Sequence, residues 1–248
     1  MTLLLHQLRF EQRIFWRSKE AAVFIFIFPL LLYALLGSVY DGEIEGEPAV
    51  DVLLAGLFGY GAMNTAFGGL AIMLVGRREL GVLKRLRSTP LPPHTYLGAV
   101  LLSTLVIFAL QSVALLALGV FAFGASAPEN PFGFAGAIVL GVASFAGLGL
   151  GAAALIRSAE GVSAVVNVIT LPMAFVSGAF GPTSSYPEFL QAIAEVLPLT
   201  YFLDLANGVY LHGDSLFADP GALAIVAAWG VAGLVVALRR FTWVPRER

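Results

Sequence analysis

The 248-residue sequence contains no cysteine and few charged residues. Without cysteine the chain cannot form disulfide bonds, thiolate metal sites or cysteine nucleophiles. Charged residues make up 12% of the sequence and apolar residues 58%, whereas soluble domains contain about 25% charged residues. The mean hydropathy is +0.87. This composition excludes an ordinary soluble domain and indicates a chain that lies in a lipid bilayer.

The sequence also lacks a dominant sign of charge and the common catalytic motifs. Its 14 Lys and Arg residues nearly balance 16 Asp and Glu residues, which gives no support to nucleic-acid binding. No G-x-x-x-x-G-K-[ST], H-E-x-x-H or G-x-S-x-G motif is present. His6, His94 and His212 lie far apart in the sequence. We therefore expect no enzyme activity, no metal site and no catalytic residue in this chain.

Six stretches are long enough to cross a membrane as helices. A hydrocarbon core of roughly 30 Å requires about 20 apolar residues. None of the six contains Asp, Glu, Lys, Arg or His, so no relay for proton coupling is evident. We predict an all-α membrane protein with a single transmembrane domain over residues 1–248. Its spans are predicted at about 21–40, 52–76, 95–124, 132–156, 161–181 and 220–238.

The basic residues indicate how the six spans are oriented. All 14 Lys and Arg residues fall on one side of a six-span arrangement: before the first span, within 77–94, at Arg157 and in the tail after residue 238. Basic residues that flank spans are retained in the cytoplasm. The sequence therefore predicts that both termini are cytoplasmic.

Residues 1–20 are predicted to form an amphipathic helix in the plane of the membrane. Arg9, Arg13 and Arg17 share one face of this helix, and Leu4 and Leu8 share another. Such a helix rests on the bilayer surface with its basic face toward anionic headgroups or toward a cytoplasmic partner. The sequence leaves both contacts open.

Residues 77–94 form the most informative cytoplasmic segment. Leu80, Leu83 and Leu86 recur every three residues, which predicts an apolar ridge on a short helix. Prolines from residue 90 onward end this helix. A basic loop is the alternative, but the regular leucine spacing favours a docking element. The basic residues around the ridge are Lys84, Arg85 and Arg87.

Two further features concern packing and the outer surface. Gly147 and Gly151 form a ridge of small residues, which allows a neighbouring helix to approach closely. The outer segment 182–219 is too charged to span the membrane and shows two short helical patterns, separated by Pro198. We expect these two helices to enter the outer leaflet and return, as a re-entrant segment.

The order of these features resembles the membrane permease subunits of type-2 ATP-binding cassette (ABC) transporters, in the branch of drug-resistance exporters. An in-plane helix precedes six spans, and residues 79–91 (ELGVLKRLRSTPL) resemble the family's coupling segment between spans two and three. Residues 197–202 (LPLTYF) and 208–213 (GVYLHG) resemble its stretch before the last span. Asn207 departs from the arginine that the family often carries before that glycine.

The resemblance implies a permease of the plasma (inner) membrane that works with a pair of ABC ATPase subunits and a second permease copy, identical or related. ATP and Mg²⁺ would bind to the ATPase, with no cofactor in this chain. The permease would export a drug-like, lipid or other amphipathic substrate along spans two and five, past Asn64, Phe67, Asn167 and Phe175. The residues that would couple to the ATPase are Glu79, Leu80, Leu83, Lys84, Arg85, Leu86 and Arg87.

Two other classes of function fit the spans and the charge pattern without the resemblance. A self-sufficient channel or secondary carrier would conduct or exchange solutes without a partner. A non-transporting membrane assembly factor would need only the anchored bundle and its basic cytoplasmic faces.

Overall fold

The computed structural model describes residues 3–40, 42–44, 46–183 and 186–244. Arg246 and Arg248 of the basic tail therefore lie outside the described residues. The elements are α1 (Leu3–Arg17), α2 (Lys19–Val39), β1 (Glu43–Ile44), β2 (Glu47–Pro48), α3 (Ala49–Ala62), the π-helix η1 (Met63–Gly69), α4 (Leu70–Glu79), α5 (Val82–Arg87), α6 (Pro93–Phe123), α7 (Pro131–Leu155), α8 (Ala159–Val176), α9 (Glu188–Ala194), α10 (Pro198–Leu211) and α11 (Pro220–Arg240).

The predicted all-α membrane fold with six spans is confirmed. The spans are α2, the continuous rod α3–η1–α4, α6, α7, α8 and α11. The fifth ends at Val176 rather than near residue 181, because Gly178 adopts a left-handed conformation with φ +85°. The second span runs from Ala49 to Glu79 and extends beyond the predicted 52–76 at both ends, while residues 52–76 themselves contain no charged residue, as predicted. Its rod contains Asp51, which is 3% exposed, and Arg78, which is fully buried.

Local sequence determines where several spans begin and end. Proline occupies the first turn of α6, α7, α10 and α11, where its missing N–H has no helical partner to lose. The side chains of Asn130 and Asp219 accept hydrogen bonds from the backbone N–H groups of Gly133 and Ala222. Gly124 ends α6 in the left-handed conformation, with φ +67°. These signals fix the ends of long helices that have almost uniformly apolar interiors.

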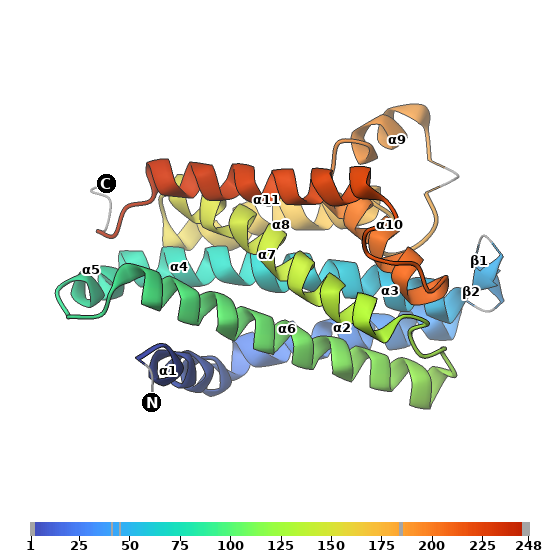
Figure 1. Ribbon diagram of the computed structural model, residues 1–248, viewed down its shortest axis with the longest axis horizontal. Helices are drawn as coiled ribbons and strands as arrows, with labels where there is room; N and C mark the ends of the chain where they lie inside the picture. The colour runs from blue at the N-terminus through green and yellow to red at the C-terminus, as the bar shows by residue number, and fades with distance from the viewer. Residues whose placement is uncertain (1–2, 41, 45, 184–185, 245–248) are drawn as a thin grey trace.

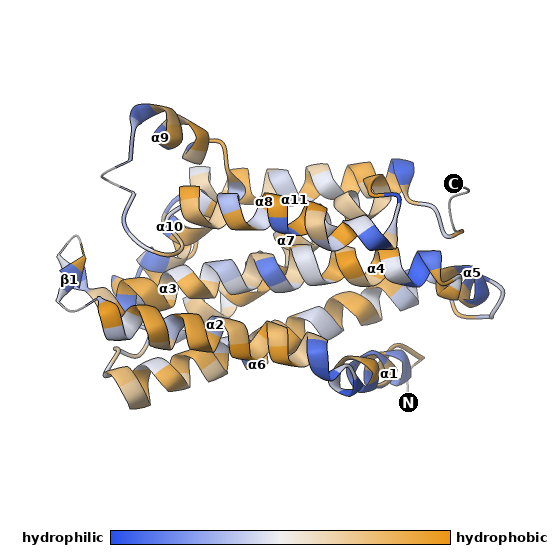
Figure 2. Cartoon of the chain, turned by 180° about the vertical axis from the view of Figure 1, so that it is seen from behind, coloured by the Kyte–Doolittle hydropathy of each residue, from blue (hydrophilic) through white to orange (hydrophobic). Residues whose placement is uncertain are grey.

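The two ends of the bundle differ in structure (Figure 1). α1, α5 and the C-terminal end of α11 lie at one end, whereas β1, β2, α9 and α10 lie at the other. α1 runs across the direction of the spans, as expected of an in-plane helix. Figure 2 shows hydrophilic residues on α1 and α5 and mostly hydrophobic residues along the spans between the two ends. The segments that the sequence assigns to each side of the membrane are thus grouped together.

The second span is the centre of the bundle. In its most apolar stretch of 18 residues, 83% of the residues are buried, whereas the corresponding values are 17% for α2 and 22% for α8. α7 packs on η1 and on α11, and the glycine ridge predicted at Gly147 and Gly151 is confirmed in this second contact. A Cβ atom at Gly147 would clash with the carbonyl oxygen of Gly230 in α11. The backbones of α7 and α11 are therefore in direct contact.

The two short outer helices also form, with a sharp bend between them. α9 and α10 meet at 79°, and each is too short to span a bilayer. The Trp229 Nε1 of α11 donates a hydrogen bond to the Val196 carbonyl at 3.2 Å, which attaches this segment to the last span. The hairpin of β1 and β2 was not predicted, because strands of two residues show no alternation.

Candidate functional site

A π-helix interrupts the second span near its middle. η1 separates α3 from α4, and π-helical turns occur mostly where a helix has a functional role. Asn64 and Thr65 are buried in this turn, and the Thr65 Oγ1 donates a hydrogen bond of 2.8 Å to the Gln111 Oε1 of α6. Close contact with α7 depends on Gly149, where a Cβ atom would lie 2.8 Å from the Phe67 carbonyl oxygen. The π-helix thus brings two polar side chains into an apolar bundle.

A cavity of about 520 Å³ lies between η1 and the in-plane helix α1. Its walls come from α1, α2, η1, α4, α6 and α8, and most of the lining side chains are apolar. Pockets of about 300–1,000 Å³ with a few polar groups typically bind small organic molecules. We call this the inner cavity. Its uncharged polar lining residues are Ser18, Asn64, Thr65, Ser103, Thr104, Ser163 and Asn167.

A second cavity, of about 390 Å³, lies on the other side of η1. Its walls come from η1, α7, α8 and α11, and Leu197 and Pro198 contribute from the segment 182–219. Apolar side chains and glycines line it, including Phe67, Phe145 and Trp229. The π-helix therefore separates a partly polar cavity from an apolar one.

The structure divides the four residues predicted to lie along the substrate path. Asn64 and Asn167 line the inner cavity together, from the second and fifth spans. Phe67 lines the apolar cavity. Phe175 lines neither of these two cavities; it is 56% exposed, and its ring centroid lies 4.8 Å from that of Phe180. The substrate path remains a prediction. Of the four residues, Asn64 and Asn167 are the two that share one cavity.

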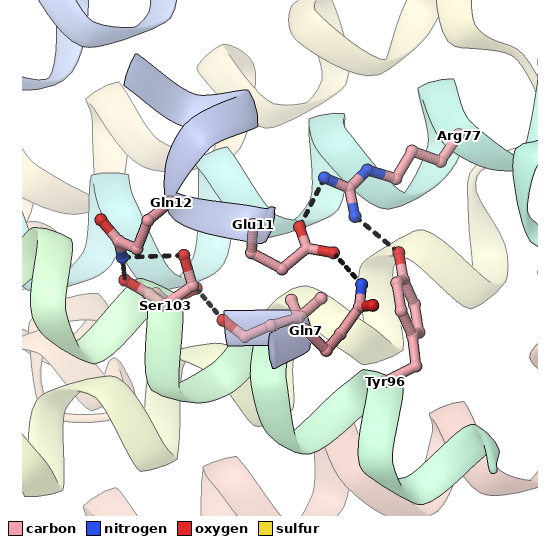
Figure 3. A network of polar contacts seen from close by, with 8 residues as sticks. Gln7, Glu11, Gln12, Arg77, Tyr96 and Ser103 are labelled. Carbon is pink, nitrogen blue, oxygen red and sulfur yellow. Dashed lines mark hydrogen bonds and ion pairs between the residues drawn. The ribbon is translucent and has the colours of Figure 1, made fainter. Parts of the chain in front are cut away.

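A buried ion pair lies in the lining of the inner cavity, and Figure 3 shows the polar network around it. The Arg77 Nη2 of α4 lies 2.6 Å from the Glu11 Oε2 of α1, and both side chains are nearly buried, at 13% and 4% exposure. The Arg77 Nη1 donates to the Tyr96 hydroxyl at 2.7 Å, and the Gln7 Nε2 donates to the Glu11 Oε1 at 2.9 Å. The Gln12 Nε2 donates to the Ser103 Oγ at 3.0 Å. Polar contacts thus attach α1 to α4 and α6.

Gln7 and Glu11 were not predicted as site residues. They lie on the inward face of α1 together with Leu4, Leu8 and Phe15, whereas Arg9, Arg13 and Arg17 are exposed. The available signal was a glutamate one turn after a glutamine on the apolar face of an otherwise basic helix. What the three exposed arginines contact remains a prediction.

The predicted ridge of three leucines is wrong in its geometry. Gly81 has a left-handed backbone, with φ +68°, which ends α4 and turns the chain into α5. Leu83 then points into the bundle and is fully buried, while Leu80 is 76% exposed. Leu86 is half-buried against the core. Leu83 and Leu86 therefore anchor α5 to this chain, and Leu80 alone of the three is fully available to a partner.

Arg78 forms a second unpredicted polar contact at the same end of the bundle as α1 and α5. It is fully buried, and its guanidinium donates to the carbonyl oxygens of Ala153 at 2.8 Å and Ile156 at 2.6 Å. Both acceptors lie at the C-terminal end of α7, where carbonyls lack helical partners and cations are favoured. Arg78 therefore joins the end of the second span to the end of the fourth, directly before the Gly81 turn.

Six apolar spans around a cavity, with a short basic helix at one end of the bundle, are typical of multispan membrane permeases. The sequence profile of the ABC-2 type transporter family matches residues 2–211. The chain therefore belongs to the ABC-2 type transporter family. Its members are transport permease subunits, in agreement with the predicted resemblance.

Curated relatives agree with this assignment. The putative transport permease YvfS of Bacillus subtilis is 26% identical over 82% of this chain and 83% of its own length. The probable multidrug ABC transporter permease YbhR of Escherichia coli is 25% identical over 62% of this chain and 43% of its own length. The linearmycin resistance permease protein LnrN of B. subtilis is 25% identical over 90% of this chain. The chain spans 58% of LnrN and under half of YbhR.

Proposed function

We propose that this chain is the permease subunit of an exporter that a separate pair of ABC ATPase subunits drives. The ATPase pair binds ATP and Mg²⁺, and two permease copies, identical or related, form the membrane part in the plasma membrane. Family membership supports the permease role, and the names of YbhR and LnrN support a drug-like or other amphipathic substrate. The substrate enters beside Asn64 and Asn167 and leaves past Phe67 and Phe175.

The observation that carries this proposal is an exposed apolar side chain beside a basic helix, at the end of the bundle that is predicted to be cytoplasmic. Leu80 is an apolar side chain with 76% exposure, and the exposed Lys84, Arg85 and Arg87 follow it on α5. The Glu79 Oε1 is buried, and among the described residues no hydrogen bond reaches it. A docked ATPase subunit would cover Leu80 and contact the basic side chains of α5. Arg78 and the buried Leu83 would transmit its movement into the second and fourth spans.

Replacement of Leu80 by aspartate tests the docking role. Burial of one leucine contributes about 1.5–3 kcal/mol, so we expect ATP-dependent export to fall roughly tenfold or more. The permease and its ATPase are copurified and reconstituted into liposomes. ATP added outside drives only the copies whose ATPase faces outward, and these should carry substrate into the liposome. Phe217→Asp is the matched control, because Phe217 is 72% exposed at the opposite end of the bundle. Equal export by both variants would contradict docking at Leu80.

The same reconstitution separates the alternative functions. A channel or secondary carrier would move solute in liposomes that contain the permease alone. A membrane assembly factor would give no ATP-dependent transport even with the ATPase present. Only export that requires both subunits and ATP agrees with the proposal.

The predicted orientation is testable because the native chain has no cysteine to interfere with labelling. Ser215 and Thr89 are exposed at opposite ends of the bundle. A membrane-impermeant maleimide should label Ser215→Cys in intact cells, and it should label Thr89→Cys only after the membrane is permeabilised. The reverse pattern would place the basic end outside and overturn the assignment of α5 as the ATPase contact.

A further inference from the structure

The inner cavity contains charged groups of both signs that cancel each other. Among its described lining residues, Glu11 and Arg77 are the only two with a formal charge. They form an ion pair at 2.6 Å, so neither charge is free to attract a charged ligand. The remaining polar lining groups are hydroxyls and amides, which donate and accept hydrogen bonds without a net charge.

We propose that the inner cavity binds uncharged amphipathic molecules, and that the Glu11–Arg77 pair sets this selectivity. This inference rests on the proposed function, because it assigns the substrate class of the same path. The ligand would place an apolar body against Phe24, Ile25 and Ile107, which line the wall. Its hydroxyl, carbonyl or amide groups would bond to Asn64, Ser163 and Asn167.

The physical reason is the cost of a charge in a site with a mostly apolar lining. A charged ligand head would lose its hydration and find no unpaired countercharge, unless it displaced one member of the ion pair. Displacement would leave the other member buried without its partner, which is strongly unfavourable. An uncharged polar head avoids both costs. The pair therefore rejects cations and anions alike as long as both members are present.

The proposal makes a sharp prediction for variants that break the pair. Arg77→Gln leaves Glu11 unpaired, so the cavity gains a net negative charge and should favour cations. Glu11→Gln leaves Arg77 unpaired, so the cavity should favour anions. The double variant Glu11→Gln/Arg77→Gln has no charge in the lining and should return to the preference for uncharged ligands.

The experiment measures binding to the purified permease without ATPase or ATP. Three dansyl-labelled alkyl probes share one apolar body and end in a hydroxyl, a trimethylammonium or a sulfonate group. Affinities come from dansyl fluorescence at increasing protein concentration. The wild type should bind the hydroxyl probe most tightly. Each single variant should shift its ratio of charged-probe to hydroxyl-probe affinity by about tenfold or more, as expected for one charge-assisted hydrogen bond.

A blocked cavity shows whether the probes bind where the proposal places them. Ala21 lines the inner cavity on α2, whereas its neighbour Ala22 is outside the lining. Ala21→Trp should abolish binding of all three probes, and the matched control Ala22→Trp should retain it. Equal binding by these two variants would overturn the assignment of the cavity.

The remaining outcomes distinguish this inference from the proposed function. Unchanged probe ratios in both single variants, or a double variant that behaves like either single one, would overturn the charge-selectivity role. If export with the ATPase were nevertheless ATP-dependent, the exporter assignment would stand without it. If the ratios switched as predicted but no ATP-dependent export occurred, the binding site would stand and the exporter assignment would fall.

Discussion

Alanine in place of Gly147 is expected to destabilise the bundle by about 3 kcal/mol, the upper end of the usual cost of overpacking. The added methyl group would clash with the Gly230 carbonyl oxygen in α11, which is backbone and cannot rotate away. The same interface contains a second restriction, because a Cβ atom at Gly151 would lie 2.7 Å from the Gly233 carbonyl oxygen. Relief would require α7 and α11 to separate along their whole contact.

The effect is measured as the unfolding temperature of the detergent-purified protein. Size-exclusion chromatography after heating to each temperature gives the fraction that remains folded. A loss of about 3 kcal/mol corresponds to a decrease of roughly 6–12 °C in the unfolding temperature for a chain of this size. The matched control is Gly76→Ala in α4, where a Cβ atom would have no neighbouring atom within 4 Å. This control should unfold at or slightly above the wild-type temperature. Equal unfolding temperatures for the two variants would show that α7 and α11 are not in backbone contact.

Methionine in place of Arg78 is expected to cost about 3–5 kcal/mol, through the loss of charge-assisted bonds in a buried site. The change removes the donors to Ala153 and Ile156 and leaves those carbonyl oxygens without them at the end of α7. Methionine has a similar length and keeps most of the packing, so the loss reports on the polar contacts.

Arg85→Met is the control for this charge removal, because Arg85 is exposed on α5 and makes a longer bond of 3.4 Å, to the Leu80 carbonyl. Its effect on the unfolding temperature should be small, since exposed substitutions usually change stability by less than about 0.5 kcal/mol. Limited proteolysis near residue 157 provides a second measurement, and cleavage there should accelerate in Arg78→Met. Similar stability of the two variants would mean that Arg78 does not hold α7.

The spans, the in-plane helix and the glycine ridge were predictable because each depends on the chain's own periodicity. A membrane requires long apolar runs, and Gly147 and Gly151 reveal their role by their spacing on one face of a helix. The partner of that ridge was not singled out, because contact between α7 and α11 depends on the packing of the whole bundle.

The candidate site was predicted less well, because the direction and burial of its side chains depend on how distant segments pack together. The three leucines at 80, 83 and 86 have helical spacing, but the left-handed backbone at Gly81 turns Leu80 away from Leu83. The ion pair of Glu11 could not be predicted from the spacing of residues on α1, because its partner Arg77 lies 66 residues further along the chain. The π-helix has no local signature comparable to a cap or a proline stop.

That π-helix has a consequence for how the second span can change over evolution. One extra residue in a helix rotates everything beyond it by about 100°, because a full turn takes 3.6 residues. η1 takes up one such extra residue inside the bundle, so α4 keeps the orientation that directs Arg77 toward α1 and Arg78 toward α7. Deletion of one residue within 63–69 would therefore restore an ordinary helix and leave both arginines directed at the same partners.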